Sequence, residues 1–317
     1  MSTIDNLMVV ENAEARPTAL KTKNATHRHR HLYLWILPAL LVYVAFKLVP
    51  MIGGLGLSML RWDGIKDAIF VGFQNFQRMA DDDKLLPALL HNVQYALGTV
   101  TGKISLALFL AILLNQALRG RTFYRTMLFL PVIMSFAVVS ILWTWMYNDQ
   151  FGLINSLLRG VGLNALAVQW LGDPRYALLA LMFVDIWKWY GFHMVIFLAG
   201  LQSIPQEYYE AARVDGATRW QQFAHITLPQ LRPVMIVNIT LALLGAFNVF
   251  EIPYIMTQGG PVNATNVLSL YSYSQAFQSG RIGYGAALSY VILLIVGVIA
   301  IVQLRLTAAN ETLNKEG

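Results

Sequence analysis

The chain has 317 residues, of which 56% are apolar and only 13% are charged, and its mean hydropathy is +0.52. Soluble globular domains are about 45–50% apolar and about 25% charged, so this composition indicates a membrane protein. There is no cysteine, which excludes disulfide bonds and thiolate metal sites. The formal charge of +6 is not arranged as a basic stripe with interleaved aromatic residues, so no nucleic-acid binding is predicted.

Six apolar runs are long enough to cross about 30 Å of hydrocarbon. They are residues 32–60, 86–118, 126–148, 176–200, 234–250 and 282–304. Each is expected to be helical, because backbone groups in lipid must form hydrogen bonds within their own segment. The predicted fold class is therefore an all-α membrane protein with six transmembrane helices in residues 32–306. Residues 1–31 and 307–317 are predicted to be polar tails.

The distribution of Lys and Arg predicts the orientation of these helices. The N-terminal tail is too long and polar for a cleaved signal peptide and ends in the sequence HRHRH at residues 27–31. Its histidines alternate with arginines, so a charge anchor is a better interpretation than a metal site. Both tails and the loops on their side carry thirteen Lys and Arg residues against seven on the other side. The positive-inside rule therefore places both termini in the cytoplasm.

Residues 203–229, between the fourth and fifth predicted spans, carry the start and stop signals of soluble helices. Ser203 followed by Gln206 forms a capping-box pattern, which predicts a helix over about residues 204–214. Gly216 follows where a helix can end on a left-handed residue. The helix has a charged edge with a spacing of three and a packing edge of small and aromatic residues. These edges are Glu207, Glu210 and Arg213, and Tyr208, Ala211 and Ala212.

A second short helix is predicted directly after the first. Thr218 with Gln221 repeats the capping pattern, and Leu228-Pro229 is expected to end this helix before the fifth span. The two helices would form a rigid elbow on the cytoplasmic side. A plain connecting loop that is stabilised by caps is the alternative interpretation, although a disordered connection would join the two spans equally well.

The elbow contains Glu210-Ala211-Ala212, Asp215-Gly216-Ala217, Phe223, Ile226 and Leu228-Pro229. This pattern resembles the EAA loop of the inner-membrane permeases of binding-protein-dependent ABC importers. Three further motifs are FVGFQNF at residues 70–76, FGLIN at residues 151–155 and TQGGP at residues 257–261. They resemble motifs of the sugar branch of that family, the maltose- and glycerol-phosphate-type permeases. The resemblance covers about residues 32–306.

This resemblance implies that the elbow docks as a coupling helix into a cleft on a separate ATPase subunit. The implied coupling residues are Glu210, Ala211, Ala212, Asp215, Gly216 and Pro229. The implied partners are a second homologous permease subunit, two ATP-binding subunits, an extracytoplasmic solute-binding protein, a carbohydrate and membrane lipid. ATP and magnesium would be bound by the ATPase, so no cofactor, metal or catalytic residue is expected in this chain.

The sequence GTVTGKIS at residues 98–105 is the nearest lookalike to a phosphate-binding loop. It has one residue too few between the glycines, and Ile104 replaces the hydroxyl residue that would bind magnesium. Because it lies inside an apolar run, Gly98 and Gly102 are predicted to form a close helix-packing face instead.

Charged residues within the spans are candidates for function, because a charge in lipid is costly unless it faces a cavity or a partner. Asp185 and Lys188 are three residues apart on the fourth span, where they could neutralise one another or serve transport. Lys47 and Lys103 are interpreted as structural, either snorkelling or paired. The sequence leaves open whether these lysines or Lys188 line a pathway.

Residues 185–193 combine aromatic faces with polar edges, which suits the C–H and hydroxyl groups of a sugar. In the fifth span, Asn248, Glu251 and Tyr254 share a face by their spacing of three. Members of the family take their solute contacts from the middle of these helices, in a cavity shared with a second permease. The corresponding predicted contacts are Asp185, Trp189, Phe192, Asn248 and Glu251.

The sequence predicts a permease subunit that moves a carbohydrate or sugar-like solute across the bacterial inner membrane by alternating access. A first alternative is an ion-coupled transporter with Asp185, Lys188 and Glu251 as a proton relay, but the inverted repeats that would favour it are not visible. A second alternative is an intramembrane enzyme, for which the sequence offers no cysteine, no HExxH and no GxSxG motif.

Overall fold

The structure is a computed structural model of the chain, and it describes residues 30–116 and 119–316. In these residues the chain is helical apart from short connections and one two-stranded sheet. The chain divides into two compact units, Met1–Gly53 and Gly54–Gly317. The predicted N-terminal anchor lies almost wholly outside the described residues.

The first unit contains the start of the first apolar span. Helix α1 (Arg30–Tyr43) continues through a π-helical turn, Val44–Leu48, into α2 (Val49–Ser58), which extends into the second unit. Residues Trp35–Ser58 are long and apolar enough to cross a membrane. Lys47 lies in the π-helical turn, and its structural role stays a prediction.

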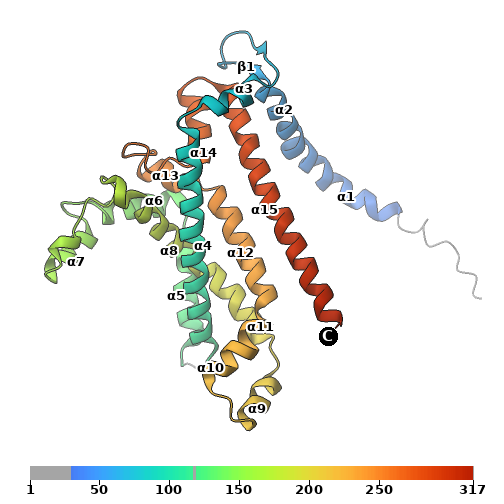
Figure 1. Cartoon of the computed structure of the whole chain (residues 1–317), viewed down its shortest axis with the longest axis vertical. Coiled ribbons are helices and arrows are strands. Elements are labelled where there is room, and N and C mark those ends of the chain that lie inside the picture. The colour runs from blue at the N-terminus through green and yellow to red at the C-terminus, as the bar shows by residue number, and fades with distance from the viewer. Residues whose placement is uncertain (1–29, 117–118, 317) are drawn as a thin grey trace, which may run out of the picture. The chain divides into compact units, whose positions relative to one another are not determined.

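The second unit is built on long helices that run beside one another (Figure 1). The longer helices are α4 (Leu85–Asn115), α8 (Pro174–Gln202), α12 (Arg232–Phe247) and α15 (Ile282–Glu316). Helix α8 is the most buried of the candidate spans and packs along α4. Two glycines of α4 allow this approach, because a Cβ on Gly98 would lie 2.6 Å from Met182 and a Cβ on Gly102 2.4 Å from Ile186. The predicted glycine packing face is therefore confirmed.

The third predicted span is not one straight helix. Helix α5 (Arg121–Ile133) and helix α6 (Phe136–Met146) meet at an angle of 97°. The break follows Pro131 and ends at Ser135, whose hydroxyl accepts a hydrogen bond from the Val138 N–H at 3.3 Å and caps α6. Five helices in the described residues are long and apolar enough to span a membrane, and six spans result when this bent pair counts as one.

The fifth span is also interrupted. Helix α12 ends at Phe247, and a short helix, α13 (Glu251–Met256), begins after three intervening residues. The last span agrees with the prediction, since Ile282–Gln303 is long and apolar enough to cross a membrane, and helix α15 continues beyond this span to Glu316.

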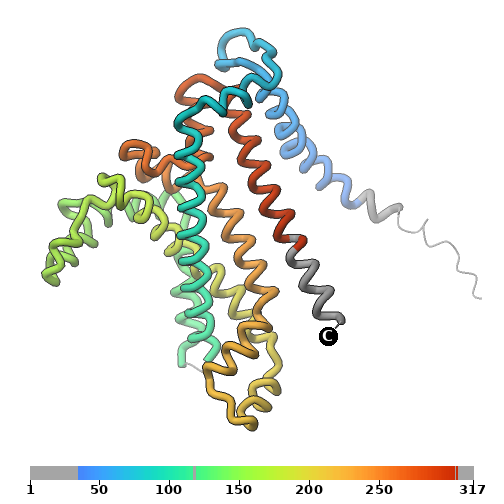
Figure 2. The backbone as a smooth tube through the Cα atoms, viewed as in Figure 1, coloured from blue at the N-terminus to red at the C-terminus, as the bar shows by residue number. Residues whose placement is uncertain are grey.

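The two ends of the second unit are built differently (Figure 2). At one end, short helices follow α8 and form the segment that the sequence predicts as an elbow. At the other end, strand β1 (Leu60–Arg61) pairs antiparallel with β2 (Ile69–Phe70). The short elements outside the elbow are α3 (Gln74–Gln77), η3 (Arg78–Asp81), α7 (Leu153–Gly160), η4 (Asn164–Leu166), α14 (Leu268–Tyr273) and η6 (Ser274–Gln278).

Candidate functional sites in the elbow and the membrane interior

The first elbow helix, α9 (Gln206–Val214), starts two residues later than predicted. Ser203 does not cap it: the Ser203 hydroxyl donates to the Gly200 carbonyl oxygen at 2.8 Å and closes the end of α8. The capping prediction for Ser203 is therefore wrong. Pro205 occupies the N-cap of α9, where no side chain accepts a hydrogen bond from the helix.

The end of α9 follows the prediction. Gly216 has a φ of +76°, in the left-handed region. The Ala217 N–H donates to the Ala212 carbonyl oxygen at 2.8 Å, and the Gly216 N–H to the Arg213 oxygen at 3.1 Å, which satisfies the last turn of the helix. A Cβ on Gly216 would meet nothing within 4 Å, so the backbone conformation rather than space favours glycine here.

The second half of the elbow begins with the predicted capping box. The Thr218 hydroxyl accepts from the Gln221 N–H, and the Gln221 side-chain oxygen accepts from the Thr218 N–H at 2.8 Å. The helix runs through α10 (Arg219–Gln222), a π-helical turn (Phe223–Thr227) and α11 (Leu228–Gln230). Pro229 does not end it, contrary to prediction, because proline is tolerated in the first turn of α11.

The two halves of the elbow are joined by Tyr209, whose hydroxyl lies 2.9 Å from the Thr227 hydroxyl. The predicted packing residue Tyr208 instead points outward and is 50% exposed. Val214 and Trp220 are 89% and 73% exposed, so apolar side chains stand on the surface of a polar segment. The exposed Glu210 carboxylate lies 3.8 Å from the Arg213 guanidinium, within α9 itself. Exposed apolar groups of this kind mark a surface for a partner.

The elbow also encloses a hollow of about 390 Å³ between α9 and α10. It is lined by Ala212, Asp215, Gly216, Ala217, Gln221, Gln222, His225 and Ile226. Three of the six predicted coupling residues, Ala212, Asp215 and Gly216, line this hollow. Glu210 and Ala211 lie in α9 and Pro229 lies in α11, outside its lining.

In the membrane interior, Asp185 pairs with a different lysine from the expected one. Its Oδ2 lies 2.8 Å from the Nζ of Lys103 on α4, and the two side chains are 6% and 3% exposed. The expectation that Asp185 and Lys188 neutralise one another is wrong, because the close α4–α8 contact at Gly102 brings Lys103 within reach. The expectation that Lys103 is paired is confirmed.

Lys188 has a separate structural role at the break between α5 and α6. Its ammonium donates to the carbonyl oxygens of Met134, Val132 and Pro131 at 2.6, 3.3 and 3.5 Å. These oxygens belong to the last turn of α5 and the bend after it, where the regular helix bonding ends. The same ammonium lies 4.7 Å from the ring centre of Phe136, which holds the bend against α8.

The predicted solute contacts fall into two groups. Trp189 and Phe192 on α8 are half-buried, with ring centres 5.7 Å apart. Asn248 and Glu251 are exposed at the break between α12 and α13, where the Asn248 amide donates to the Leu244 carbonyl oxygen at 2.8 Å. Asp185 is buried and held by Lys103, so the other four predicted contacts are the ones with surface for a ligand.

Tyr254 belongs to an aromatic group whose other members, Phe250, Tyr273 and Phe277, were not predicted from the sequence. Tyr273 lies with its ring centre 5.1 Å from Phe250, 5.3 Å from Tyr254 and 5.1 Å from Phe277. Three of these rings border a hollow of about 440 Å³, whose other walls include Ser269, Ser272 and Ser289. The spacing of four between Tyr273 and Phe277 is the sequence signal that could have identified this face.

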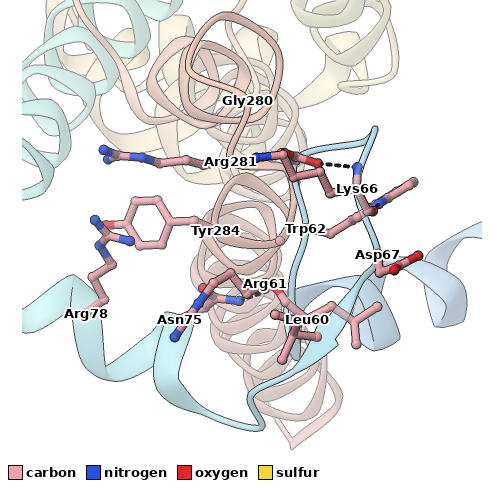
Figure 3. A pocket seen from close by; sticks show the side chains of 13 residues that line it. Leu60, Arg61, Trp62, Lys66, Asp67, Asn75, Arg78, Gly280, Arg281 and Tyr284 are labelled. Atoms are coloured by element: carbon pink, nitrogen blue, oxygen red, sulfur yellow. Dashed lines mark hydrogen bonds between the residues drawn. The ribbon is translucent and has the colours of Figure 1, made fainter.

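The opposite end of the second unit has a pocket of about 290 Å³ beside the β1–β2 loop (Figure 3). Arg61, Arg78 and Arg281 line it together with Tyr284. Nearby, Asp82 accepts hydrogen bonds from the hydroxyls of Tyr271 and Tyr284. Partial burial opposes ionisation of Asp82, but these hydrogen bonds outweigh it and lower the pKa of this carboxyl below its usual value.

Residues of the FVGFQNF and FGLIN motifs stabilise the segments that connect the helices. Asn75 of FVGFQNF donates to the carbonyl oxygens of Ser58 and Leu60, both at 2.8 Å. In FGLIN, Asn155 bridges the Val168 backbone and the Trp170 indole, while a Cβ on Gly152 would lie 2.2 Å from the Asn148 carbonyl oxygen.

Comparisons with known proteins agree with this architecture. Residues 103–309 match the family described as "Binding-protein-dependent transport system inner membrane component". The chain is 38% identical to the probable ABC transporter permease protein YurN of Bacillus subtilis, over 86% of this chain and 94% of that protein. It is 36% identical to the trehalose/maltose transport system permease protein MalF of Thermococcus litoralis, over 86% and 92%.

A solved structure shares the fold. It is described as a bacterial ABC transporter involved in the import of the acidic polysaccharide alginate. The TM-score is 0.78 with 26% sequence identity, and the match covers 89% of this chain and 96% of that one.

Proposed function

The chain belongs to the inner-membrane components of binding-protein-dependent transport systems, and we propose that it is the permease subunit of an ABC importer for a carbohydrate or sugar-like solute. The observation that carries this proposal is the ordered elbow between α8 and α12, which exposes apolar side chains without a partner in the described part of the chain. Similarity to a trehalose/maltose permease and to an alginate importer supports the solute class.

The elbow is the proposed docking point for an ATPase subunit. Glu210, Ala211, Ala212, Asp215, Gly216 and Pro229 are the proposed coupling residues. The caps at Thr218 and Gly216 and the Tyr209–Thr227 hydrogen bond make the segment rigid. Switching a two-state gate from about 1:99 to 99:1 takes about 5.5 kcal/mol of differential binding, and a rigid elbow can transmit that free energy where a mobile loop would dissipate it.

The complete importer would contain this chain, a second homologous permease, two ATP-binding subunits and an extracytoplasmic solute-binding protein. ATP and magnesium would be bound by the ATPase subunits, so this chain would carry no cofactor and no catalytic residue. Closure of the ATPase pair would draw the two elbows together and open the solute cavity outward.

Both termini and the elbow are proposed to face the cytoplasm, on the basis of the asymmetric distribution of Lys and Arg. A single cysteine placed at the exposed Thr218 of this cysteine-free chain tests the orientation. It should resist a membrane-impermeant thiol reagent in intact cells and react after the membrane is opened. Rapid labelling in intact cells would invert the topology and remove the coupling proposal.

The solute is proposed to contact Trp189 and Phe192 on α8 and Asn248 and Glu251 at the α12–α13 break. An aromatic face and an unpaired carboxylate are complementary to the C–H and hydroxyl groups of a sugar. The Glu251 carboxylate forms no hydrogen bond or ion pair with the described residues. Asp185 is proposed to act on this region through its pairing with Lys103, in place of the direct contact predicted from the sequence.

Reconstituted vesicles provide the decisive experiment. Uptake of a candidate sugar should require the co-purifying ATPase subunits, internal ATP and the loaded binding protein. Trp189→Ala and Glu251→Ala should lower uptake while the binding protein still stimulates ATP hydrolysis. Uptake driven by an ion gradient without the ATPase would contradict the importer proposal, and unchanged uptake in both variants would move the solute site elsewhere.

A further inference from the structure

Three arginines lie in the residues that begin α5, at the end of the second unit that carries the elbow. Arg119 and Arg121 flank Gly120, and Arg125 follows one turn later. In the described residues, none of the three has a carboxylate within 4.0 Å. This distinguishes them from Lys103, which has an aspartate, and from Lys188, which has three carbonyl oxygens.

Two of these arginines converge on one neutral atom. With the Gln202 amide oriented to satisfy its neighbours, its side-chain oxygen accepts from Arg121 Nη2 at 2.9 Å and from Arg125 Nη2 at 2.6 Å. An amide oxygen carries no net charge, so the repulsion between the two guanidinium groups remains uncompensated. The Nε of Arg125 is buried and has no hydrogen-bond partner among the described residues. A buried donor without an acceptor is uncommon, and together with the uncompensated charge it leaves an acceptor position open at this site.

The start of α5 adds a second source of positive potential. Gly120 is its N-cap in a left-handed conformation and, having no side chain, supplies no acceptor for the free N–H groups of the first turn. The helix has thirteen residues, and the positive end of its dipole therefore points at the region of the arginines. Three cations and an uncapped helix start together suit a phosphate group.

The surface next to the arginines is apolar. Phe123, Tyr124 and Met127 on α5 are 60%, 49% and 53% exposed. Aromatic side chains of this kind lie at the level of lipid headgroups in membrane proteins. A ligand with a phosphate alone would leave this apolar face uncovered. A phospholipid has a phosphate that can reach the arginines and acyl chains that can cover the adjacent face of α5.

We propose that Arg119, Arg121 and Arg125 bind the phosphate of an anionic phospholipid in the leaflet at the elbow end. The lipid phosphate takes the acceptor position that Gln202 fills only in part, and its chains cover the exposed face of α5. Gln202 is the last residue of α8 and the elbow follows directly after it. The lipid is therefore placed at the joint between the span and the elbow.

Native mass spectrometry of the purified importer complex tests this site, with phosphatidylglycerol, phosphatidylcholine and inorganic phosphate as separate probes. The double variant Arg121→Gln/Arg125→Gln should retain phosphatidylglycerol about tenfold less than the unaltered protein, since a juxtamembrane arginine contributes substantially to binding anionic lipid. The control Arg232→Gln/Arg305→Gln removes two exposed cations outside the site and should retain it equally.

A second variant keeps both arginines. Gln202→Glu supplies an internal carboxylate between them and should lower phosphatidylglycerol retention to a similar extent without destabilising the fold. Equal retention in both variants would overturn the proposal, as would equal binding of phosphatidylcholine. Displacement of the lipid by millimolar inorganic phosphate would assign the site to a free anion. Binding to the isolated permease but not to the complex would assign the arginines to a partner subunit. None of these outcomes depends on which solute is transported.

Discussion

The elbow and the membrane interior differ in which side chains are buried and bonded within the chain and which are left exposed. In the interior, Asp185, Lys103 and Lys188 are nearly inaccessible, and each is bonded within the chain. In the elbow, Tyr208, Val214 and Trp220 are exposed. A charged side chain in lipid destabilises the fold unless it pairs with another group of the chain. An apolar side chain in water costs less, so it can stay exposed until a partner protein covers it.

This contrast separates folding groups, which are buried residues bonded within the chain, from docking groups, which are exposed residues available to a partner. The ionisable residues of the fourth span are the ones that a sequence analysis would assign to transport, yet they hold α4, α5 and α8 together. The residues available for interaction are those that remain exposed, such as Glu251 at the α12–α13 break and Trp220 on the elbow, whose ring contacts Phe223 but is still 73% exposed. The contrast can be tested by removing one group at a time.

The largest effect is expected at the buried ion pair. Asp185→Asn should destabilise the fold by about 3–5 kcal/mol, because it leaves the Lys103 ammonium buried without its counter-charge. The yield of monodisperse protein after detergent extraction, and its thermal unfolding, measure the loss. The double variant Lys103→Met/Asp185→Leu removes both charges and should recover most of the stability. Normal stability of Asp185→Asn alone would show that this pair is not a folding group.

The next effect is expected at the bend between α5 and α6. Lys188→Met should lower stability by about 2 kcal/mol, since the carbonyl oxygens of Val132 and Met134 lose a charged donor. Lys188→Arg keeps a donor and should lose less. Thermal unfolding of both variants in the same detergent gives the comparison. Equal melting temperatures for Lys188→Met and the unaltered chain would mean that the bend does not need this lysine.

Sequence signals predicted those features of the elbow and of the interior that depend on near neighbours, and missed those that depend on packing between helices. The Thr218–Gln221 cap and the left-handed Gly216 depend on neighbours within three or four residues, so their pattern is visible in the sequence. The partner of Asp185 depends on how α4 packs, and the spacing of three wrongly favoured Lys188. The break after Ile133 falls in an uninterrupted apolar run, where hydropathy carries no information about direction. Ser203 is a residue type that often caps helices, but its hydroxyl donates to the Gly200 carbonyl oxygen at the end of α8 and therefore does not cap α9.

A smaller loss of stability is expected in the elbow. Gly216→Val forces a β-branched residue to a φ of +76° and should cost about 1–3 kcal/mol locally. Because a Cβ there meets nothing within 4 Å, Gly216→Asn should be tolerated. The valine variant should insert normally but lose stimulation of ATP hydrolysis by the loaded binding protein, whereas the asparagine variant should keep it. Full stimulation in the valine variant would reduce the elbow to a connector.

The smallest effect is expected at Asp82. This residue is intermediate between the buried interior charges and the exposed elbow side chains, because it is half-exposed yet bonded within the chain to Tyr271 and Tyr284. Its pKa is lowered in the folded state, so its contribution to stability is present above the unfolded pKa of about 3.9 and is lost as pH falls through the folded pKa. Solvent screening keeps this contribution below about 1 kcal/mol. Asp82→Asn should therefore melt slightly earlier than the unaltered chain at neutral pH, and the difference should vanish in acid. Asp81→Asn, at an exposed neighbour, is the matched control and should melt like the unaltered chain at neutral pH. A difference for Asp82→Asn that persists in acid would mean that the tyrosines hold the loop through shape rather than through the carboxylate charge.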